Sequence, residues 1–532
     1  MDAFKPITER PWPPAKWREG IAILGTVVLS DLVLYRGHGF TGLAVLFAAT
    51  SVLLTLASPG PRFKDSNTVK TPSPLRSWSF WVVGVLLLAS TAKLVWCGSP
   101  LLVVVAIAML AAFTAALSGV CPHVLETVFM AVQIIPAGYF GLCHYERSFK
   151  ERPRHHAVTS GRWLAVLLPL AAFVVFGLLF ILANPNLVTF FRDVRQWLER
   201  FAPTVPEMLL WVATAWTTVG LLRPMLGRTT EEILDSDEDS SPVGSDSPSP
   251  WYAALRNTLT TVILLFAVYL AFEFNTLWFR VFPKGFYYSG YAHEGAAWLT
   301  VALALATLML SLAFRGGMLQ DPRLPRLRRL AWLWSLENMI LAIAVYHRLL
   351  IYVGFNGMTR MRVIGFLGIS AVVVGFAMVV WKIIGNHNFL WLIRRQLWTL
   401  ALAVYLFALA PTDAIVVRYN VHRILAGDLA PSVQISVHPI DSEGVLQLLP
   451  LLRCSDPIIS HGVAAMLAER QITAEQLAQQ RRNKGWTAYQ GADSLVHRTL
   501  NAHADQWSEW TKDSRRRSES LQKFRGYAYQ WY

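Results

Sequence analysis

Long apolar runs dominate the chain, and most are about twenty residues long with short polar segments between them. A helix of roughly 20 residues crosses the hydrocarbon core of a bilayer, so these runs predict transmembrane helices. They are continuous rather than alternating, which argues against the strands of a membrane barrel. We expect about eleven spans, at 21–36, 39–58, 78–97, 100–118, 162–183, 206–224, 252–273, 294–314, 330–353, 361–383 and 396–411.

One further apolar run, 120–143, is long enough to cross but contains Pro122, His123, Glu126, Gln133 and Pro136. Basic loops help to interpret it, because loops rich in Lys and Arg stay in the cytoplasm. Three loops qualify, with Arg62, Lys64, Lys70 and Arg76; Arg147, Lys150, Arg152, Arg154 and Arg162; and Arg315, Arg323, Arg326, Arg328 and Arg329. All three fall on one side only if 120–143 does not cross.

We therefore interpret 120–143 as a re-entrant or interfacial helix. This gives a cytoplasmic N-terminus and places the C-terminal region on the outer side of the membrane. If 120–143 does cross, the three basic loops no longer lie on one side. The side predicted for the C-terminal region then depends on which of these loops is taken as cytoplasmic.

Composition agrees with a membrane protein: 54% of the residues are hydrophobic and 15% are charged, against about 25% charged in soluble domains. The net charge of +14 comes from basic residues in short loops, so we expect a lipid bilayer and no nucleic acid as partner. The four cysteines, Cys97, Cys121, Cys143 and Cys454, form no CxxC pair. They predict neither a metal nor a redox site, and we expect no cofactor.

Composition also divides the chain into four parts. We expect an N-terminal transmembrane half over 1–228, a disordered acidic linker over 229–250, a C-terminal transmembrane half over 251–411, and an extramembrane helical domain over 412–532. Within that domain, Ser455 or Asp456 followed by Pro457 predicts a helix start. Thr473 followed by Gln476 predicts a second start. The predicted class is all-α, a polytopic helical bundle with a C-terminal helical domain.

Several stretches resemble a known family. They are "ANPNLVTFFRDVRQWL" from Ala183, "YSGYAHEGAAWLTVALALA" from Tyr288, "GMTRMRVIGFLGISAVVVGFAMVVWKI" from Gly357 and "APTDAIVVRYNVHRILAGD" from Ala410. Their order resembles a family of bacterial multi-pass membrane proteins known only as a domain of unknown function, over about Leu164–Leu451. The resemblance implies the bacterial cytoplasmic (inner) membrane and a helical bundle; it implies no site residues and no reaction.

The ninth predicted span contains charged residues, which are costly inside a membrane and often functional. Glu337 and Arg348 are eleven residues apart, close to three helical turns, so they share one face about 16 Å apart along the axis. Tyr352 follows on that face, and His347 lies beside Arg348. Glu337 and Arg348 are too far apart to pair, so each needs another partner.

A second group of polar residues lies at the outer ends of the neighbouring spans. Its members are Glu273, Tyr288, Tyr291, His293 and Glu294. Together with Arg348 they form a candidate site for an anionic lipid or a polar solute in the outer leaflet. We expect Arg348 to contact Glu273 or Glu294, because a guanidinium at this depth needs oxygen ligands. Alternatively, the aromatic residues are interface anchors and Arg348 holds helices together.

Three functions remain open at this point. The first is a non-enzymatic scaffold, sensor or accessory protein that binds a protein partner through 412–532. The second is a transporter or lipid-handling protein that uses Glu337 and the cluster around Arg348. The third is a membrane-embedded transferase. The motifs of common enzyme families do not occur in the chain, so an enzyme is the less favoured reading.

Overall fold

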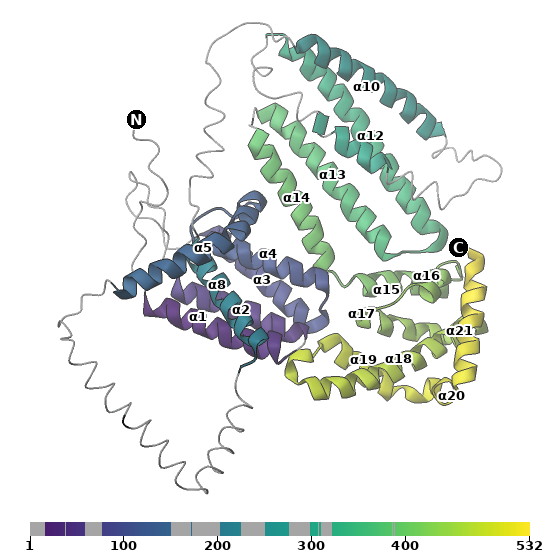
Figure 1. Ribbon diagram of the computed structural model, residues 1–532. Helices are drawn as coiled ribbons and strands as arrows, with labels where there is room; N and C mark the ends of the chain where they lie inside the picture. The colour runs from purple at the N-terminus through teal and green to yellow at the C-terminus, as the bar shows by residue number, and fades with distance from the viewer. Residues whose placement is uncertain are drawn as a thin grey trace. The chain divides into compact units, whose positions relative to one another are not determined.

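The computed structural model describes residues 16–37, 39–58, 77–150, 172, 203–224, 251–275, 298–306, 308–309, 322–385, 387 and 389–531. Every regular element in these residues is a helix, and none of them is a strand (Figure 1). The all-α class is therefore confirmed. The predicted linker 229–250 and all but one residue of the predicted span 162–183 lie outside the described residues.

Nine helices of the described part are long and apolar enough to cross a membrane. They are α2 (Phe40–Ala57), α3 (Trp78–Cys97), α4 (Pro100–Leu117), α5 (Val124–Lys150), α8 (Val205–Leu222), α10 (Tyr252–Glu273), α12 (Leu324–Asn356), α13 (Arg360–Gly385) and α14 (Phe389–Leu409). All except α5 coincide with predicted spans. The chain is thus a multi-pass membrane protein.

The predicted span 21–36 differs from these nine. It consists of α1 (Trp17–Ser30), which has 14 residues, and a π-helix, η2 (Asp31–Tyr35), that continues it. The doubtful segment 120–143 forms most of α5, a single helix with Pro136 inside it. Its apolar part, Val124–Glu146, has the length of a span. The interpretation of 120–143 as re-entrant or interfacial stays a prediction.

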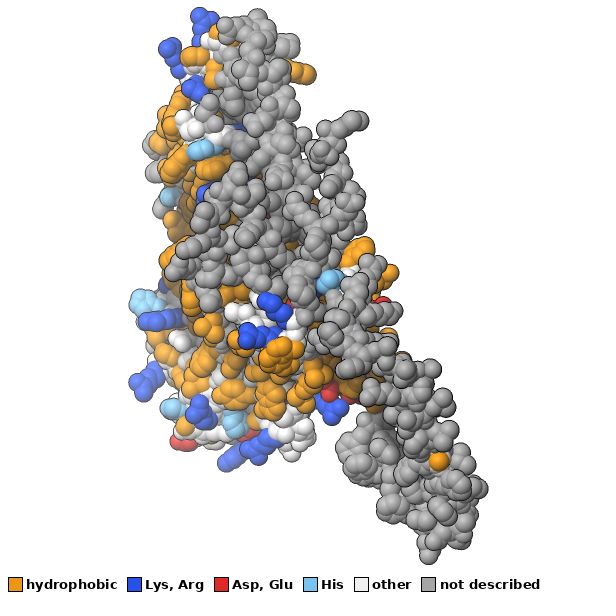
Figure 2. Space-filling model, turned by 90° about the vertical axis from the view of Figure 1, so that its left-hand side faces the viewer, with side chains coloured by type: hydrophobic (Ala, Val, Ile, Leu, Met, Phe, Trp, Pro, Cys, Tyr) orange, Lys and Arg blue, Asp and Glu red, His pale blue; other side chains and the backbone are white. Residues whose placement is uncertain are grey.

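Several of these helices leave their apolar side chains uncovered. Only 11% of the apolar stretch of α10 is buried, and Leu264, Leu265 and Val268 are all more than 60% exposed. Hydrophobic side chains cover much of the described surface in Figure 2. A water-soluble protein rarely exposes so large an apolar face, whereas lipid chains cover it at no cost.

The chain divides into two compact units. The first combines Met1–Arg36, Ala49–Pro59 and Val132–Met225, and the second combines Gly37–Ala48, Gly60–Ala131 and Leu226–Tyr532. Helices α2 and α5 therefore contribute to both units. In the first unit α1 and α8 are antiparallel, because Glu19 at the start of α1 contacts Arg223 at the end of α8, and Arg36 contacts Glu207 at the start of α8.

The second unit contains a membrane part and a helical domain. In the membrane part, Trp334 of α12 packs with Leu259 of α10, Val379 of α13 and Leu392 of α14. The hairpin of α3 and α4 packs on α14, where Tyr405 donates its hydroxyl to the Leu86 carbonyl at 2.8 Å.

The helical domain follows α14 directly. Its elements are α15 (Thr412–Leu425), α16 (Ser432–Val437), α17 (Ser442–Val445), η6 (Leu446–Arg453), α18 (Pro457–Lys484), η7 (Trp486–Ala488), α19 (Gly491–Ala502), η8 (Ala504–Trp507), α20 (Ser508–Lys512), α21 (Ser514–Ala528) and η9 (Tyr529–Trp531). Leu467, Leu500, Trp507 and Phe524 lie in its core. Gly462 is required there, because a Cβ at this position would lie 2.3 Å from the Phe524 ring.

Helix α18 tests both helix starts that the sequence predicted in this domain. Asp456 is its N-cap and accepts from the backbone of Ile458 and Ile459, and Pro457 is its first residue, as predicted. The start predicted at Thr473 is wrong. Helix α18 continues through it, and the Thr473 hydroxyl donates to the Glu469 carbonyl one turn earlier. A capping-box pattern is a local signal, and it does not by itself start a new helix where the backbone is already helical.

Candidate functional site

Helix α12 carries several buried polar residues on the face that packs against its neighbouring helices. Glu337 and Arg348 are both buried, as are Leu341 and Val345 between them. The eleven-residue spacing puts both charges on the inward face, and the apolar residues separate them. The predicted candidates on α12 therefore form two local polar groups rather than one continuous site.

The first group is an ion pair between α10 and α12. Arg348 donates from Nε and Nη2 to the two carboxylate oxygens of Glu273, and their side chains are only 4% and 1% exposed. The Tyr269 hydroxyl lies against both, donating to Glu273 at 2.9 Å and accepting from Arg348 at 3.3 Å. The predicted contact between Arg348 and Glu273 is confirmed. Whether this group binds a ligand stays a prediction.

The other candidates near Arg348 are only partly described. His347 and Tyr352 are half-buried, and the Arg362 guanidinium lies 3.7 Å from the centroid of the Tyr352 ring. Tyr288, Tyr291, His293 and Glu294 lie outside the described residues. Their place in an outer-leaflet site therefore stays a prediction.

The second group surrounds Glu337. This residue is buried, as expected, but its Oε2 atom has no hydrogen-bond partner among the described residues. The same holds for Trp334 Nε1 and Asn338 Oδ1 on the same face, although Asn338 Nδ2 donates to the Trp334 carbonyl. Our expectation of a partner for Glu337 stays a prediction, because no side chain among the described residues bonds to its Oε2 atom. Unsatisfied polar atoms in an apolar interior are costly, so this group calls for an explanation.

The turn between α12 and α13 is bound to the helical domain. Gly357 has φ +98°, a conformation that favours glycine, and a Cβ there would meet Asn420 Oδ1 at 2.5 Å. Asn420 of α15 accepts from Met358 N at 2.7 Å and donates to Met358 O at 2.9 Å. Arg423 donates to the Val353 and Gly354 carbonyls at 2.6 Å each. Two of the last carbonyls of α12 are thus satisfied by the domain.

Ion pairs strengthen this junction on two spans. Arg360 at the start of α13 pairs with Asp413 of α15, through two hydrogen bonds. Lys93 of α3 pairs with Glu443 of α17 at 2.5 Å. Asp441, the N-cap of α17, lies 3.8 Å from Arg360, and burial, together with the Asp413 charge, raises its pKa.

Three side chains at the junction have the geometry of a metal site. The ligand atoms of Cys97, Asp441 and Glu443 all lie within 4.8 Å of one another. However, Glu443 is paired with Lys93, and Arg360 lies near Asp441. These cations already compensate the carboxylates, so a metal ion would have to displace them. The group is better explained as part of the ion-paired junction.

The first unit contains a buried cluster that the sequence did not reveal. Glu19 accepts from Arg223 Nε at 2.8 Å and from Nη2 at 3.1 Å, with both side chains fully buried. The Tyr145 hydroxyl of α5 also contacts Glu19. Glu19 and Arg223 stand at the ends of apolar runs, 204 residues apart, where charges usually face water. Only the antiparallel packing of α1 and α8 brings them together.

The comparisons with known proteins identify a family without a known function. The sequence profile described as Domain of unknown function (DUF4153) matches residues 78–438. This is more than half of the chain, and the chain therefore belongs to this family. The match includes most of the stretch over which the sequence resembled such a family and begins before it. No curated protein and no solved structure matches.

Proposed function

We propose that this family member is a non-enzymatic scaffold or sensor of the bacterial cytoplasmic membrane, whose C-terminal helical domain is held firmly to the ends of its spans. The junction is the observation that supports this function. The domain satisfies the end of α12 through Asn420 and Arg423, and pairs charges with α3 and α13. A domain serving only as a tethered tail would not need such contacts. A protein partner of 412–532 belongs to the same proposal.

The orientation of the second unit supports a domain on the outer side. The end of α3 and the turn between α12 and α13 meet the domain. The opposite ends of α12 and α14 are strongly basic, with Arg323, Arg326, Arg328, Arg329, Arg394 and Arg395. Basic ends face the cytoplasm, so the domain faces outward.

The same unit supports an α5 that does not cross. Helix α4 begins beside the domain and runs away from it, because Gly98, just before it, donates to Gln490. Helix α10 begins at that far end too, since the Arg323 guanidinium at the start of α12 lies 4.0 Å from the Tyr252 ring. An even number of crossings must therefore connect α4 to α10. The predicted spans 162–183 and 206–224 supply two, and α5 would make the number odd.

A pair of fusion reporters tests the orientation. Alkaline phosphatase fused at Gln480 should be active, because it folds outside the cytoplasm, and a green fluorescent protein fused there should be dark. The same reporters fused at Arg323 are the matched control and should give the opposite result. Bright fluorescence at Gln480 with inactive phosphatase would contradict the proposed side.

Firm attachment of the domain predicts a coupled response to Asp413→Asn. This change weakens the charged contacts of Arg360 and should destabilise the junction by about 1 kcal/mol, a modest value because the Arg360 side chain is 46% exposed. Hydrogen exchange followed by mass spectrometry should then show faster exchange in α15 and in the α12–α13 turn together.

Asp441→Asn is the matched control. Asn caps helices as well as Asp does, and the raised pKa of Asp441 shows that its charge is disfavoured in the folded domain. This variant should therefore change stability by less than about 0.5 kcal/mol. If Asp413→Asn loosened α15 alone and left the turn protected, the domain would be an independent unit and the coupling would be refuted.

A second candidate function is a transporter or lipid-handling protein. The observation that favours it is the group of buried atoms at Trp334, Glu337 and Asn338 that have no hydrogen-bond partner among the described residues. A polar solute passing along α12 would supply the missing partners, and charged residues within spans often mark such pathways. A transferase stays a third hypothesis, because it needs several acid and base groups at one depth.

A further inference from the structure

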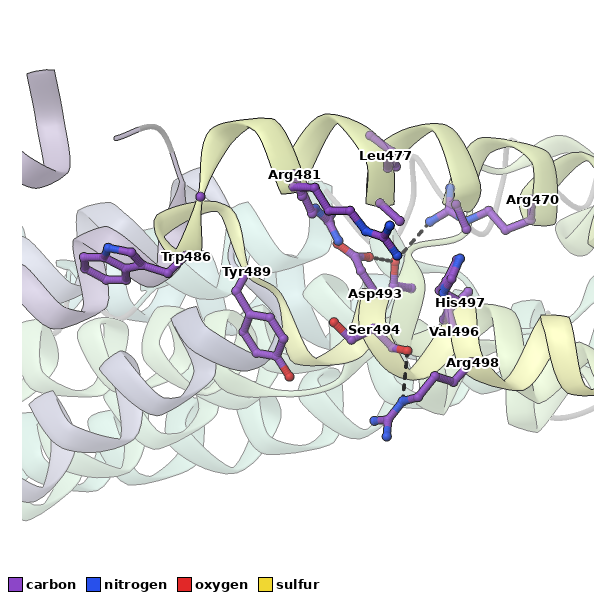
Figure 3. Close-up of a pocket in the computed structure, with 15 residues that line it drawn as sticks. Arg470, Leu477, Arg481, Trp486, Tyr489, Asp493, Ser494, Val496, His497 and Arg498 are labelled. Carbon is purple, nitrogen blue, oxygen red and sulfur yellow. Dashed lines mark hydrogen bonds and ion pairs between the residues drawn. The ribbon is translucent and has the colours of Figure 1, made fainter. Parts of the chain in front are cut away.

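A cavity of 390 Å³ lies between α18 and α19 of the helical domain (Figure 3). Its volume is in the range of ligand pockets and far exceeds that of a single bound water. Its lining combines basic side chains with aromatic and aliphatic ones, among them Arg482, Arg498, Trp486, Tyr489 and Leu477.

The charges that line the pocket are not balanced. Asp493 is the one carboxylate among its lining residues, and four arginines line the pocket as well. Asp493 is already engaged, because Arg481 pairs with it and the Ser442 hydroxyl donates to it. Figure 3 shows Arg470 and Arg481 reaching from α18 toward this carboxylate. Arg470 Nη2 donates to Ser442 Oγ at 3.2 Å.

Two of the arginines keep most of their hydrogen-bonding capacity free. Arg482 is exposed and has no ion-pair partner among the described residues. The Arg498 contact is a 3.4 Å hydrogen bond to the Ser494 carbonyl. A guanidinium has five N–H donors, so both side chains can still bind an anion. An uncompensated cluster of this kind matches a phosphate group, which arginine binds through paired hydrogen bonds.

The aromatic end of the pocket lies where two spans end. The Tyr489 carbonyl accepts from the Thr41 hydroxyl in the first turn of α2. The next residue, Gln490, accepts from Gly98 N at 2.6 Å and donates to the Leu94 carbonyl of α3 at 2.9 Å. Trp486 and Tyr489 are 56% and 48% exposed. Exposed Trp and Tyr at the end of a span favour the level of the lipid headgroups.

We propose that this pocket binds the phosphate group of an anionic phosphate ester, with a phospholipid headgroup or a soluble phosphate ester as its source. Arg482 and Arg498 bind the phosphate oxygens, and Arg470 and Arg481 add positive charge. Trp486, Tyr489 and Leu477 contact the apolar part of the ligand. This proposal adds a ligand to the helical domain of the proposed function. It rests on that function in one respect, because the side of the membrane on which the domain lies decides which leaflet would supply a lipid.

The test uses the purified full chain in a neutral detergent. Its thermal unfolding and its dissociation constants are measured with dioctanoyl phosphatidylglycerol, with dioctanoyl phosphatidylcholine and with glycerol phosphate. The phosphatidylglycerol should bind at least about tenfold more tightly than the phosphatidylcholine. The double variant Arg482→Glu with Arg498→Glu should weaken that binding by about tenfold or more, because two attractive contacts become repulsive.

The matched control is Lys523→Glu with Arg525→Glu. Both residues are exposed on α21 and do not line the pocket, and the pair makes the same change in net charge. This variant should bind phosphatidylglycerol like the unchanged chain. Both double variants should unfold at the temperature of the unchanged chain when no ligand is present, which shows that a loss of binding is not a loss of folding.

Each outcome decides the proposal. Tight binding of phosphatidylglycerol alone, lost in the pocket variant, identifies a lipid source. Equally tight binding of glycerol phosphate, lost in the same variant, identifies a soluble source. The proposal is overturned if both lipids bind equally well and glycerol phosphate does not bind. It is also overturned if both double variants lose binding to the same extent. Detergent removes membrane orientation from the measurement, so a negative result here leaves the reporter test of the proposed function intact.

Discussion

Replacing Arg348 with Met is expected to lower the free energy of unfolding by about 3–5 kcal/mol. The change leaves the Glu273 carboxylate buried, 1% exposed, with the Tyr269 hydroxyl as the donor that remains in this group. An uncompensated charge in a low-dielectric interior is far less stable than a paired one. Reversible unfolding in mixed micelles, followed by circular dichroism, measures the loss.

The double variant Glu273→Gln with Arg348→Met is the control for this pair. Replacing a whole buried ion pair by neutral side chains often costs little, so the double variant should recover most of the stability lost in Arg348→Met. Equal losses in the single and double variants would mean that Arg348 acts through its packing or through other contacts. The pair would then not be the main interaction between α10 and α12.

Replacing Glu337 with Leu is expected to raise the free energy of unfolding by about 1–3 kcal/mol. The side chain is 8% exposed and one of its carboxylate oxygens has no partner among the described residues. Leu is apolar, like Leu341 and Val345 on the same buried face of α12. Glu337→Lys, which introduces a longer charged group at the same position, should damage folding.

The Glu337 variants also separate the candidate functions. A residue on a solute pathway is expected to be retained at a cost in stability, so Glu337→Leu would stabilise the protein and abolish transport. A scaffold or sensor would keep its activity in the same variant. A clear loss of stability in Glu337→Leu would show that the carboxylate has a partner in the membrane. The interpretation that Glu337 is an unsatisfied buried group would then be wrong.

Local sequence patterns predicted some contacts of the candidate site. The eleven-residue spacing placed Glu337 and Arg348 on the buried face of α12, and the demand of a guanidinium for oxygen ligands led to Glu273. The missing partner of Glu337 Oε2 among the described residues was not predictable, because it depends on which side chains of neighbouring helices face that position. The capping pattern at Thr473 failed as well, because α18 continues through this position.

The sequence by itself determined the class of this protein. Runs of apolar residues of span length fix the helical membrane class, because a backbone in hydrocarbon must satisfy its hydrogen bonds within each helix. Tertiary structure decided the charge pairs that no sequence pattern predicted. It paired Glu19 with Arg223, joined Lys93 to Glu443 across 350 residues and gathered the arginines of α18 and α19 at one pocket. Such pairs depend on helix packing between distant segments, which no local pattern of residues encodes.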